Sequence, residues 1–176
     1  AKAKKGLKGS TIKFPSISVG ATENALLAAF NAKGKTILKN CAIEPEIKDL
    51  ISFLTKLGAK IKLSGRTITI YQNKDKKIKA NHSVMFDRIE AGTYMIASAL
   101  AGKKITINRI IPSIIQTEID TLRKIGIKIE KNKFSITILK NKKLKKINIL
   151  TKPYPGFPTD LQAQLMVLLT QANGTS

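Results

Sequence analysis

The chain has 176 residues, of which 43% are hydrophobic and 24% are charged. A chain of this length buries roughly 70% of its unfolded surface, which is enough for one or two packed cores. No apolar run approaches the ~20 residues of a membrane span and no secretory signal opens the sequence, so we expect no membrane partner. The single cysteine excludes an internal disulfide framework and fits a reducing cytoplasm, where we expect the protein to act.

The formal net charge of +21 first suggests a nucleic-acid-binding protein. However, only four of the 32 basic residues are arginine, the side chain best suited to bidentate recognition, and 28 are lysine. Aromatic residues, which stack on single-stranded bases, make up only 5%. The lysines are dispersed or gather in two turns, Lys74–Lys79 and Lys140–Lys146. We interpret this charge as a solvated surface that would attract an anionic ligand, with a basic RNA-binding module as the alternative.

The first 75 residues predict a β-α-β-α-β-β unit. Alternating and helical hydrophobic periodicities place its elements near residues 11–14, 22–32, 36–40, 46–57, 59–63 and 66–71. In the second helix Ile47, Leu50, Ile51, Leu54 and Leu57 form one apolar stripe, as in a helix that covers one face of a sheet.

The same pattern returns after 68 positions. Leu57–Ile61 reappears as Ile125–Ile129, and Gly34–Ile37 reappears as Gly102–Ile105. A fixed period of this length indicates supersecondary units that stack on their neighbours. We therefore predict one domain over residues 1–176, with repeat one at about 11–75, repeat two at about 76–142 and a partial repeat three at about 143–176. The last unit begins near Ile147 and is incomplete.

The first helix of each repeat is apolar or small nearly all round. These helices contain the segments Ala25–Phe30, Ala91–Ala101 and Leu161–Leu169. Helices of this kind are buried on every side, so we predict three parallel helices inside, with sheets and amphipathic helices outside. Their N-termini would then meet at one end, where the positive ends of three helix dipoles favour an anion. The outer helix of repeat two is predicted to begin with a capping box from Ser113 to Gln116.

Residues 153–164 lead from a proline-rich turn into the third apolar helix. Prolines fix an extended approach, and Thr159 with Gln162 reads as a capping box that makes Thr159 the N-cap. Asp160 would then lie in the first turn, beside unpaired backbone N–H groups. An ionised, fixed carboxylate there could accept a proton from a substrate, or it could simply stabilise its own helix.

These residues resemble a known family. The chain is similar to the UDP-N-acetylglucosamine 1-carboxyvinyltransferases of the enolpyruvyl transferase family over nearly its whole length, and the matching segments are Ser18–Asn24, Glu44–Ile47, Asp87–Thr93 and Pro153–Gln164. The resemblance implies transfer of enolpyruvyl from phosphoenolpyruvate to the 3-hydroxyl of UDP-N-acetylglucosamine, in peptidoglycan precursor synthesis. It also implies an inside-out α/β barrel, a second domain that this chain lacks, and no activity from this chain alone.

The resemblance also implies roles for individual residues. Asp160 would be the catalytic carboxylate that takes the proton of the sugar hydroxyl, and Thr159 would touch the sugar. The UDP portion would be bound by Ser16, Ser18, Val19 and Gly20, although the family commonly has lysine at position 16.

Two further charged residues, Glu46 and Arg88, would line the mouth between the domains. Before Asp87, the family usually has proline where this chain has Phe86.

No metal, no cofactor and no nucleic-acid partner are expected. Cys41 is interpreted as a small buried side chain and not as a reactive thiol. His82 is the only histidine, so no metal cluster can be built around it, and we expect it at the surface or at a strand end. The alternatives to the main interpretation are a shikimate-pathway enolpyruvyl transferase, the basic RNA-binding module, and a structural remnant without a ligand.

Overall fold

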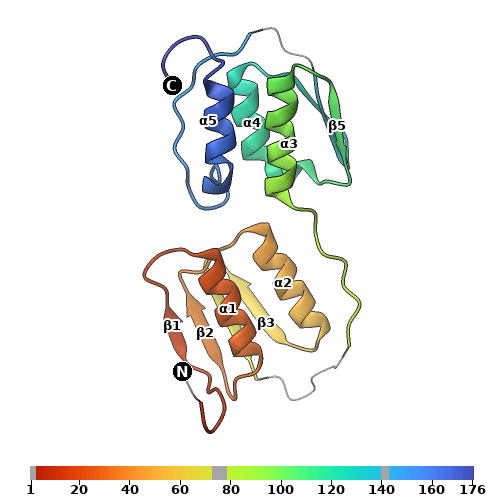
Figure 1. The fold of residues 1–176 in the computed structure, drawn as a ribbon. Helices are drawn as coiled ribbons and strands as arrows, with labels where there is room; N and C mark the ends of the chain where they lie inside the picture. Colours follow the sequence, from red (N-terminus) through yellow and green to blue (C-terminus); the bar gives the residue numbers. More distant parts are fainter. Residues whose placement is uncertain (1–2, 73–78, 140–142) are drawn as a thin grey trace. The chain divides into compact units, whose positions relative to one another are not determined.

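The computed structural model describes residues 3–72, 79–139 and 143–176. Residues 74–78 and 140–142 of the two lysine-rich turns lie outside these ranges. The chain divides into two compact units, residues 1–85 and residues 86–176, which we call unit 1 and unit 2 (Figure 1). Each unit has its own hydrophobic core and is described by itself. The single domain over residues 1–176 stays a prediction.

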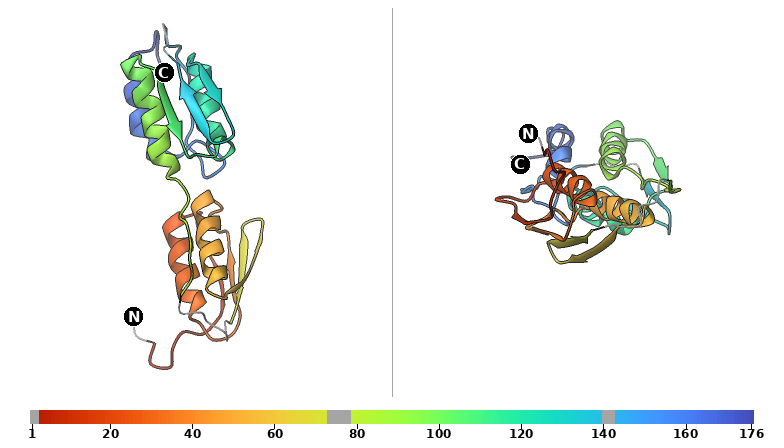
Figure 2. Two further views of the ribbon diagram at one scale, coloured as in Figure 1. Left: turned by 90° about the vertical axis from the view of Figure 1, so that its right-hand side faces the viewer. Right: turned by 90° about the horizontal axis from the view of Figure 1, so that it is seen from below.

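Unit 1 has the predicted order β-α-β-α-β-β. Its elements are β1 (Thr11–Lys13), α1 (Val19–Phe30), β2 (Thr36–Lys39), α2 (Pro45–Lys56), β3 (Lys60–Ser64) and β4 (Thr67–Tyr71). The sheet order is β1-β2-β4-β3, in which β1 and β2 are parallel and the other pairs are antiparallel. Helices α1 and α2 lie side by side on one face of this sheet (Figures 1 and 2).

The core of unit 1 follows the two periodicities of the sequence. Ile47 and Leu54 of the predicted apolar stripe are buried, as are Ile68 and Ile70, which alternate along β4. Pro45 occupies the first turn of α2, where its missing N–H costs nothing. The helix face and the sheet face therefore meet as the sequence predicts.

Unit 2 begins directly with a helix. Its elements are α3 (Arg88–Ala101), β5 (Ile105–Asn108), the 3₁₀ turn η1 (Pro112–Ile115), α4 (Gln116–Ile125), β6 (Ile129–Lys131), β7 (Ser135–Ile138), the 3₁₀ turn η2 (Thr159–Leu161) and α5 (Gln162–Leu169). The strands form an antiparallel sheet of order β5-β7-β6. Within the described ranges, no helix combines the length and apolar character that crossing a membrane requires.

Residues 79–85, which precede α3, pack in unit 1. His82 Nε2 lies 3.1 Å from Asp49 of α2, and its ring centroid lies 5.4 Å from that of Phe53. Lys56 Nζ donates to the Asn81 carbonyl at 3.2 Å. The expected surface position of His82 is wrong, because the side chain is only 10% exposed between this segment and α2.

The capping box predicted at Ser113 is also wrong. Ile111 is the N-cap of η1, and no side chain caps that turn. Gln116 instead begins α4, and its amide bonds Asp120 at 2.6 Å. Proline at the first position of η1 starts a tight turn, so α4 begins two residues later than a capping box at Ser113 requires.

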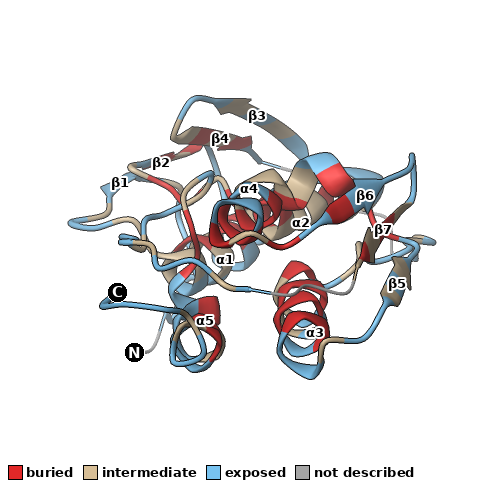
Figure 3. Cartoon of the chain, turned by 90° about the horizontal axis from the view of Figure 1, so that it is seen from above, coloured by how far each residue is buried: buried red, intermediate tan, exposed pale blue. Residues whose placement is uncertain are grey.

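The three apolar helices contain both buried and exposed residues (Figure 3). Leu26 in α1 and Leu165 in α5 are buried, whereas Leu27 is 47% exposed, Tyr94 in α3 is 55% exposed and Met166 in α5 is 60% exposed. Helices α3 and α5 pack against each other inside unit 2, whereas α1 belongs to unit 1. Burial on every side is therefore not observed, and the packing of all three helices together stays a prediction.

Candidate functional site

The turn that begins α1 presents backbone N–H groups at an open surface. Ser18 is the N-cap, with an extended backbone and with its Oγ accepting from the Ala21 amide at 3.2 Å. The amides of Val19 and Gly20, in the first turn, have no acceptor within the helix. A Cβ at Gly20 would meet no atom within 4 Å, so this end of the helix is open. Such an end suits a phosphate group.

A buried threonine holds the Ser18 turn in place. The Thr22 hydroxyl donates to the Ser18 carbonyl at 2.7 Å and accepts from the Ala42 amide at 3.0 Å. Both Thr22 and Ala42 are fully buried. The bond between Thr22 and Ala42 connects α1 to the segment between β2 and α2. Thr22 was not among the site residues predicted from the sequence. Ser16, by contrast, is exposed two residues before the cap.

Asp160 lies at the exposed start of the third apolar helix, as predicted, but the predicted cap is wrong. Pro158 is the N-cap in an extended conformation, no side chain caps the turn, and Thr159 lies inside η2. Gln162 begins α5, and its amide lies 3.9 Å from Met166 Sδ instead of reaching back to the backbone. The tight 3₁₀ turn shifts the α-helix start by two residues, which removes the spacing that a capping box needs.

The carboxylate of Asp160 is available to a ligand. Its side chain is exposed and makes no hydrogen bond or ion pair with any residue in the described ranges. It lies in the first turn of η2, next to the exposed Thr159. Leu161, in contrast, is fully buried and fixes the turn to the core.

The proline-rich loop before Asp160 is anchored to α4 and α3. The Thr117 hydroxyl of α4 donates to the Pro155 carbonyl at 2.6 Å. The Arg88 guanidinium of α3 lies 5.9 Å from the centre of the Tyr154 ring. Phe157 is buried, and its carbonyl accepts from the Lys152 amide at 2.9 Å. Thr117 lies 38 residues from Pro155 in sequence, so no local pattern could have identified this contact.

Arg88 and Glu118 form a buried ion pair in unit 2. Their charged groups are 3.7 Å apart, and the side chains are 7% and 4% exposed. This contact joins α3 to α4 beneath the proline-rich loop. Glu46, the other residue predicted at the interdomain mouth, is half-buried in the first turn of α2, in unit 1. The role of both residues at a mouth stays a prediction.

Two of the three predicted helix N-termini lie together in unit 2. Asp87 caps α3 by accepting from the amides of Ile89 and Glu90 at 2.8 and 3.0 Å. Helix α3 contacts both η2 and α5, and the two helices run in the same direction (Figure 1). The third N-terminus, at Ser18, belongs to unit 1.

Close packing joins α3 to the start of α5. A Cβ at Gly92 would collide with the Leu161 side chain, and Gln164 Nε2 donates to Thr93 Oγ1 at 3.1 Å. A small residue at position 92 therefore lets the α3 backbone approach the turn that carries Asp160.

Cys41 is fully buried in unit 1, as predicted. Burial raises the pKa of its thiol, although a hydrogen bond with the Ile68 backbone opposes the shift. The thiol is therefore protonated and inert at neutral pH. Among the residues that the structure describes, no three His, Cys, Asp or Glu side chains gather as metal ligands would.

Comparisons with known proteins give one family. The model of the EPSP synthase (3-phosphoshikimate 1-carboxyvinyltransferase) family matches residues 1–176. The UDP-N-acetylglucosamine 1-carboxyvinyltransferase of Pelagibacter ubique is 56% identical over 100% of this chain and 42% of its own length. The enzyme of the same name from Halothermothrix orenii is 49% identical over 97% of this chain and 41% of its own length.

Solved structures agree at the level of the fold. The enolpyruvyl transferase NikO from Streptomyces tendae has a TM-score of 0.75 and 25% identity, covering 88% of this chain and 38% of that one. EPSP synthase from Acinetobacter baumannii, at 20% identity and a TM-score of 0.58, shows the fold alone. The chain thus spans about two fifths of the length of the relatives that it matches.

Proposed function

Because the chain belongs to the EPSP synthase family of carboxyvinyltransferases, we propose that it is the UDP-sugar-binding part of an enzyme that transfers enolpyruvyl to UDP-N-acetylglucosamine. The observation that carries this proposal is the 56% identity, over the whole chain, to a relative named for that activity. The second substrate would be phosphoenolpyruvate, and the product would enter peptidoglycan synthesis in the cytoplasm. The remaining three fifths of the relatives' length would supply the second domain.

In this proposal the Ser18 turn binds the diphosphate of the UDP-sugar. Two open amides at the start of α1, Val19 and Gly20, and the positive end of the helix dipole favour a doubly charged group there. Ser16 would contribute a hydroxyl contact and no positive charge. The surrounding lysine-rich surface would attract the anionic substrate over a longer range.

Asp160 would take the proton of the sugar 3-hydroxyl as that oxygen attacks the enolpyruvyl carbon. A carboxylate is a weak base for an alcohol, so proton transfer is coupled to formation of the C–O bond. Thr159, exposed beside it, would contact the sugar. The anchors of the loop before Asp160, Thr117 and Arg88, fix the direction from which the carboxylate approaches the sugar.

We also propose the family's inside-out barrel as the arrangement of the intact domain. Exposed apolar side chains on α1, α3 and α5, namely Leu27, Tyr94 and Met166, support this arrangement. Helices α1, α3 and α5 would pack together, and the sheets and the amphipathic helices α2 and α4 would cover them. The Ser18 turn and Asp160 would then serve one substrate, with Glu46 and Arg88 toward the second domain.

The test is a titration of ¹⁵N-labelled residues 1–176 with UDP, UDP-N-acetylglucosamine and shikimate 3-phosphate. UDP and UDP-N-acetylglucosamine are both expected to shift the amide NMR signals of Val19 and Gly20, and only the UDP-sugar is expected to shift the signal of Asp160 as well. In Asp160→Asn the shifts at Val19 and Gly20 should persist, whereas the response at position 160 should change. The control substitution Asp120→Asn on α4 should leave all of these shifts as they are. Shifts with shikimate 3-phosphate alone would favour the shikimate-pathway alternative.

The intact reaction needs both domains closed on the substrates, so residues 1–176 should release no phosphate from phosphoenolpyruvate with UDP-N-acetylglucosamine. Measurable phosphate release would contradict this reading. The high lysine content supports one second candidate, a basic RNA-binding module. RNA affinity that falls steeply with salt, without any response to UDP, would favour that candidate.

A further inference from the structure

The face of the unit 1 sheet that points away from α1 and α2 carries a group of exposed lysines (Figures 1 and 2). Successive side chains of a strand point to opposite faces of its sheet. In β4, Ile68 and Ile70 are buried toward the helices, so Thr67, Thr69 and Tyr71 point to the outer face. The strand pairing then assigns the residues opposite these three to the same face.

Lysines flank all three outward side chains of β4. Lys39 of β2 lies opposite the first of them, and Lys62 and Lys60 of β3 lie opposite the second and the third. Lys13 of β1 lies opposite Lys39. Just before β2, Lys35 places its Nζ atom 5.7 Å from the centre of the β4 tyrosine ring. These five lysines and the three hydroxyl-bearing side chains of β4 form one surface, which we call the lysine face.

No acidic residue within the strands offsets this charge. Strands β1, β2, β3 and β4 contain neither aspartate nor glutamate. All five lysines are exposed, and within the described ranges none of their ammonium groups forms an ion pair. Their positive charges therefore add, and the resulting potential reaches about 10 Å from the face at an ionic strength of about 0.1 M.

The equivalent sheet face of unit 2 has a different charge. In β7, Ile136 and Ile138 are buried, so the outward positions of β5, β7 and β6 hold serine, threonine and asparagine together with Glu130. Lys131 of β6 lies on the helix side, where its Nζ donates to the Gln116 side chain of α4 at 2.9 Å. Because the two sheets share the repeat but differ in charge, the lysines of unit 1 are not required by the fold.

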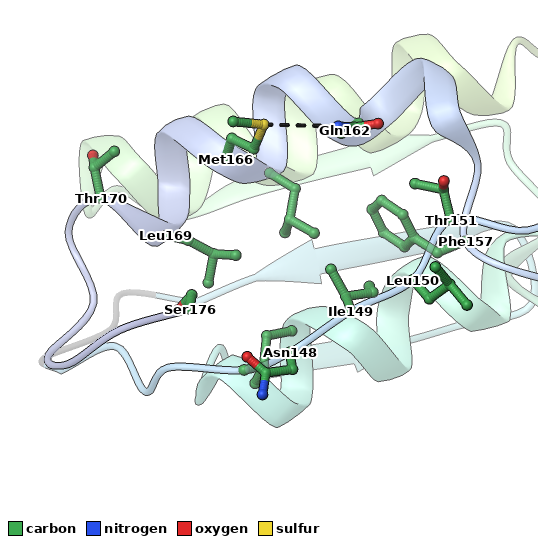
Figure 4. A pocket seen from close by; sticks show the side chains of 12 residues that line it. Asn148, Ile149, Leu150, Thr151, Phe157, Gln162, Met166, Leu169, Thr170 and Ser176 are labelled. Atoms are coloured by element: carbon green, nitrogen blue, oxygen red, sulfur yellow. Dashed lines mark hydrogen bonds between the residues drawn. The ribbon is translucent and has the colours of Figure 1, made fainter.

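Unit 2 also has a cavity beside α5 that offers an anion no countercharge (Figure 4). Its volume is about 540 Å³, and all of its lining side chains are uncharged, among them Leu165, Met166 and Leu169 of α5. An anionic surface is therefore attracted to the lysine face of unit 1 and not to this cavity.

We propose that the lysine face is a peripheral docking surface for a membrane that contains anionic phospholipids. Clusters of about four to eight basic residues are typical of such surfaces. The five lysines spread in two dimensions, on both sides of β4 and along the strands, with neighbouring strands about 4.8 Å apart. A planar array of headgroup phosphates meets all of them at once, whereas a linear polymer follows only one row. The hydroxyl groups of β4 add hydrogen-bond donors for the phosphate oxygens.

The composition of the lysine face favours lipid over nucleic acid. Its strands contain no arginine, the side chain that reads guanine by paired hydrogen bonds. Its one aromatic ring, that of Tyr71, already has Lys35 over it, which leaves no free platform for a base. A peripheral contact needs no spanning helix. The expectation of no membrane partner considered only spanning and secretory segments, so it does not bear on this surface.

The test is cosedimentation of residues 1–176 with vesicles of phosphatidylcholine and phosphatidylserine in equal amounts. Binding should disappear at high salt and with vesicles of phosphatidylcholine alone. Lys60→Gln with Lys62→Gln should lower the partition coefficient about 25-fold, since each lysine near an anionic surface contributes a factor of about five. The matched control, Lys48→Gln with Lys124→Gln, removes the same charge from exposed positions of α2 and α4 and should lower it less than about twofold.

A second variant tests the other side of β4. Lys13→Gln with Lys39→Gln removes two lysines from β1 and β2 and should lower the partition coefficient as much as the β3 variant does. Amide NMR spectra would establish that each variant keeps the fold of unit 1. Loss of binding in both variants, with retention in the control, supports a defined face.

Three outcomes would overturn the proposal. The β3 variant and the helix control could bind the mixed vesicles equally, which would mean that only net charge matters. Vesicles of phosphatidylcholine alone could bind as well as the mixed ones. Finally, polyuridylate RNA could displace the parent chain from the vesicles and lose its affinity in the β3 variant, which would make the face a nucleic-acid site. No UDP-sugar takes part, so failure of the UDP titration would leave these results unaffected.

Discussion

The clearest test of the Ser18 turn is the substitution Thr22→Val. Valine has nearly the same shape as threonine, so the change removes the hydroxyl without leaving a cavity. The lost group donates to the Ser18 carbonyl at 2.7 Å and accepts from the Ala42 amide at 3.0 Å. Because Ala42 is fully buried, its amide would lose its acceptor where water cannot replace it.

The expected cost can be worked out from these two bonds. The Ser18 carbonyl keeps a second donor, the Thr22 amide at 3.1 Å, so losing the hydroxyl bond to this carbonyl costs little free energy. The Ala42 amide is left unsatisfied, and a buried unsatisfied donor costs about 1–3 kcal/mol. We therefore expect unit 1 to lose about 2 kcal/mol of unfolding free energy. Thr55→Val is the matched control, because its hydroxyl donates only to the Ile51 carbonyl on an exposed helix face and should change stability by less than about 0.5 kcal/mol.

Native-state hydrogen exchange in urea is the appropriate assay, since two compact units can unfold separately and a single global transition would mix them. The free energies would be read at amides of β2 and β4, inside the core of unit 1. The same samples would give the exchange rate of the Ala42 amide itself. If Thr22→Val and Thr55→Val gave equal stabilities, the argument that Thr22 holds the turn through Ala42 would be refuted.

The remaining predictions concern single contacts. The pKa of the Cys41 thiol is raised above its ordinary 9.0, so stability should fall as the pH rises above that value, and iodoacetamide at pH 8 should react slowly until urea is added. Gly92→Ala should destabilise unit 2 by about 1 kcal/mol in a urea titration, because the collision with Leu161 outweighs the gain in helix propensity. Arg88→Met should cost about 3 kcal/mol in the same titration, because the Glu118 carboxylate loses its buried countercharge. If Gly92→Ala or Arg88→Met had the same unfolding free energy as the parent chain, the prediction for that substitution would be wrong.

The elements of unit 1 were predictable because their signals are local. The stripe containing Ile47 and Leu54 and the alternation at Ile68 and Ile70 depend on residues within a few positions of each other. Near Ile147, where the third unit was predicted to begin, the described residues form only the isolated bridges at Lys145 and Thr151, because a strand exists only with a hydrogen-bonded partner strand. Local pattern therefore identified the repeat, and pairing decided which of its strands are present.

The candidate site was likewise predictable from the sequence only in part. The exposed start of the third apolar helix, where Asp160 lies, was predictable from the prolines that precede it. The 3₁₀ turn that places Thr159 inside η2 was not predictable, because the spacing of Thr159 and Gln162 also fits a capping box. The contacts of Thr117 and Arg88 with the proline-rich loop join residues far apart in sequence, and no periodicity records them.

Each end of the proposed site is fixed by contacts within its own unit. The Ser18 turn depends on Thr22 and Ala42 in unit 1, and the Asp160 turn depends on Thr117 and Leu161 in unit 2. Since the two sets share no residue, their energetic effects should add. Combining Thr22→Val with Thr117→Val should therefore lower the unfolding free energy of each unit by the same amount as the single substitution in that unit, as read by hydrogen exchange at amides of each core.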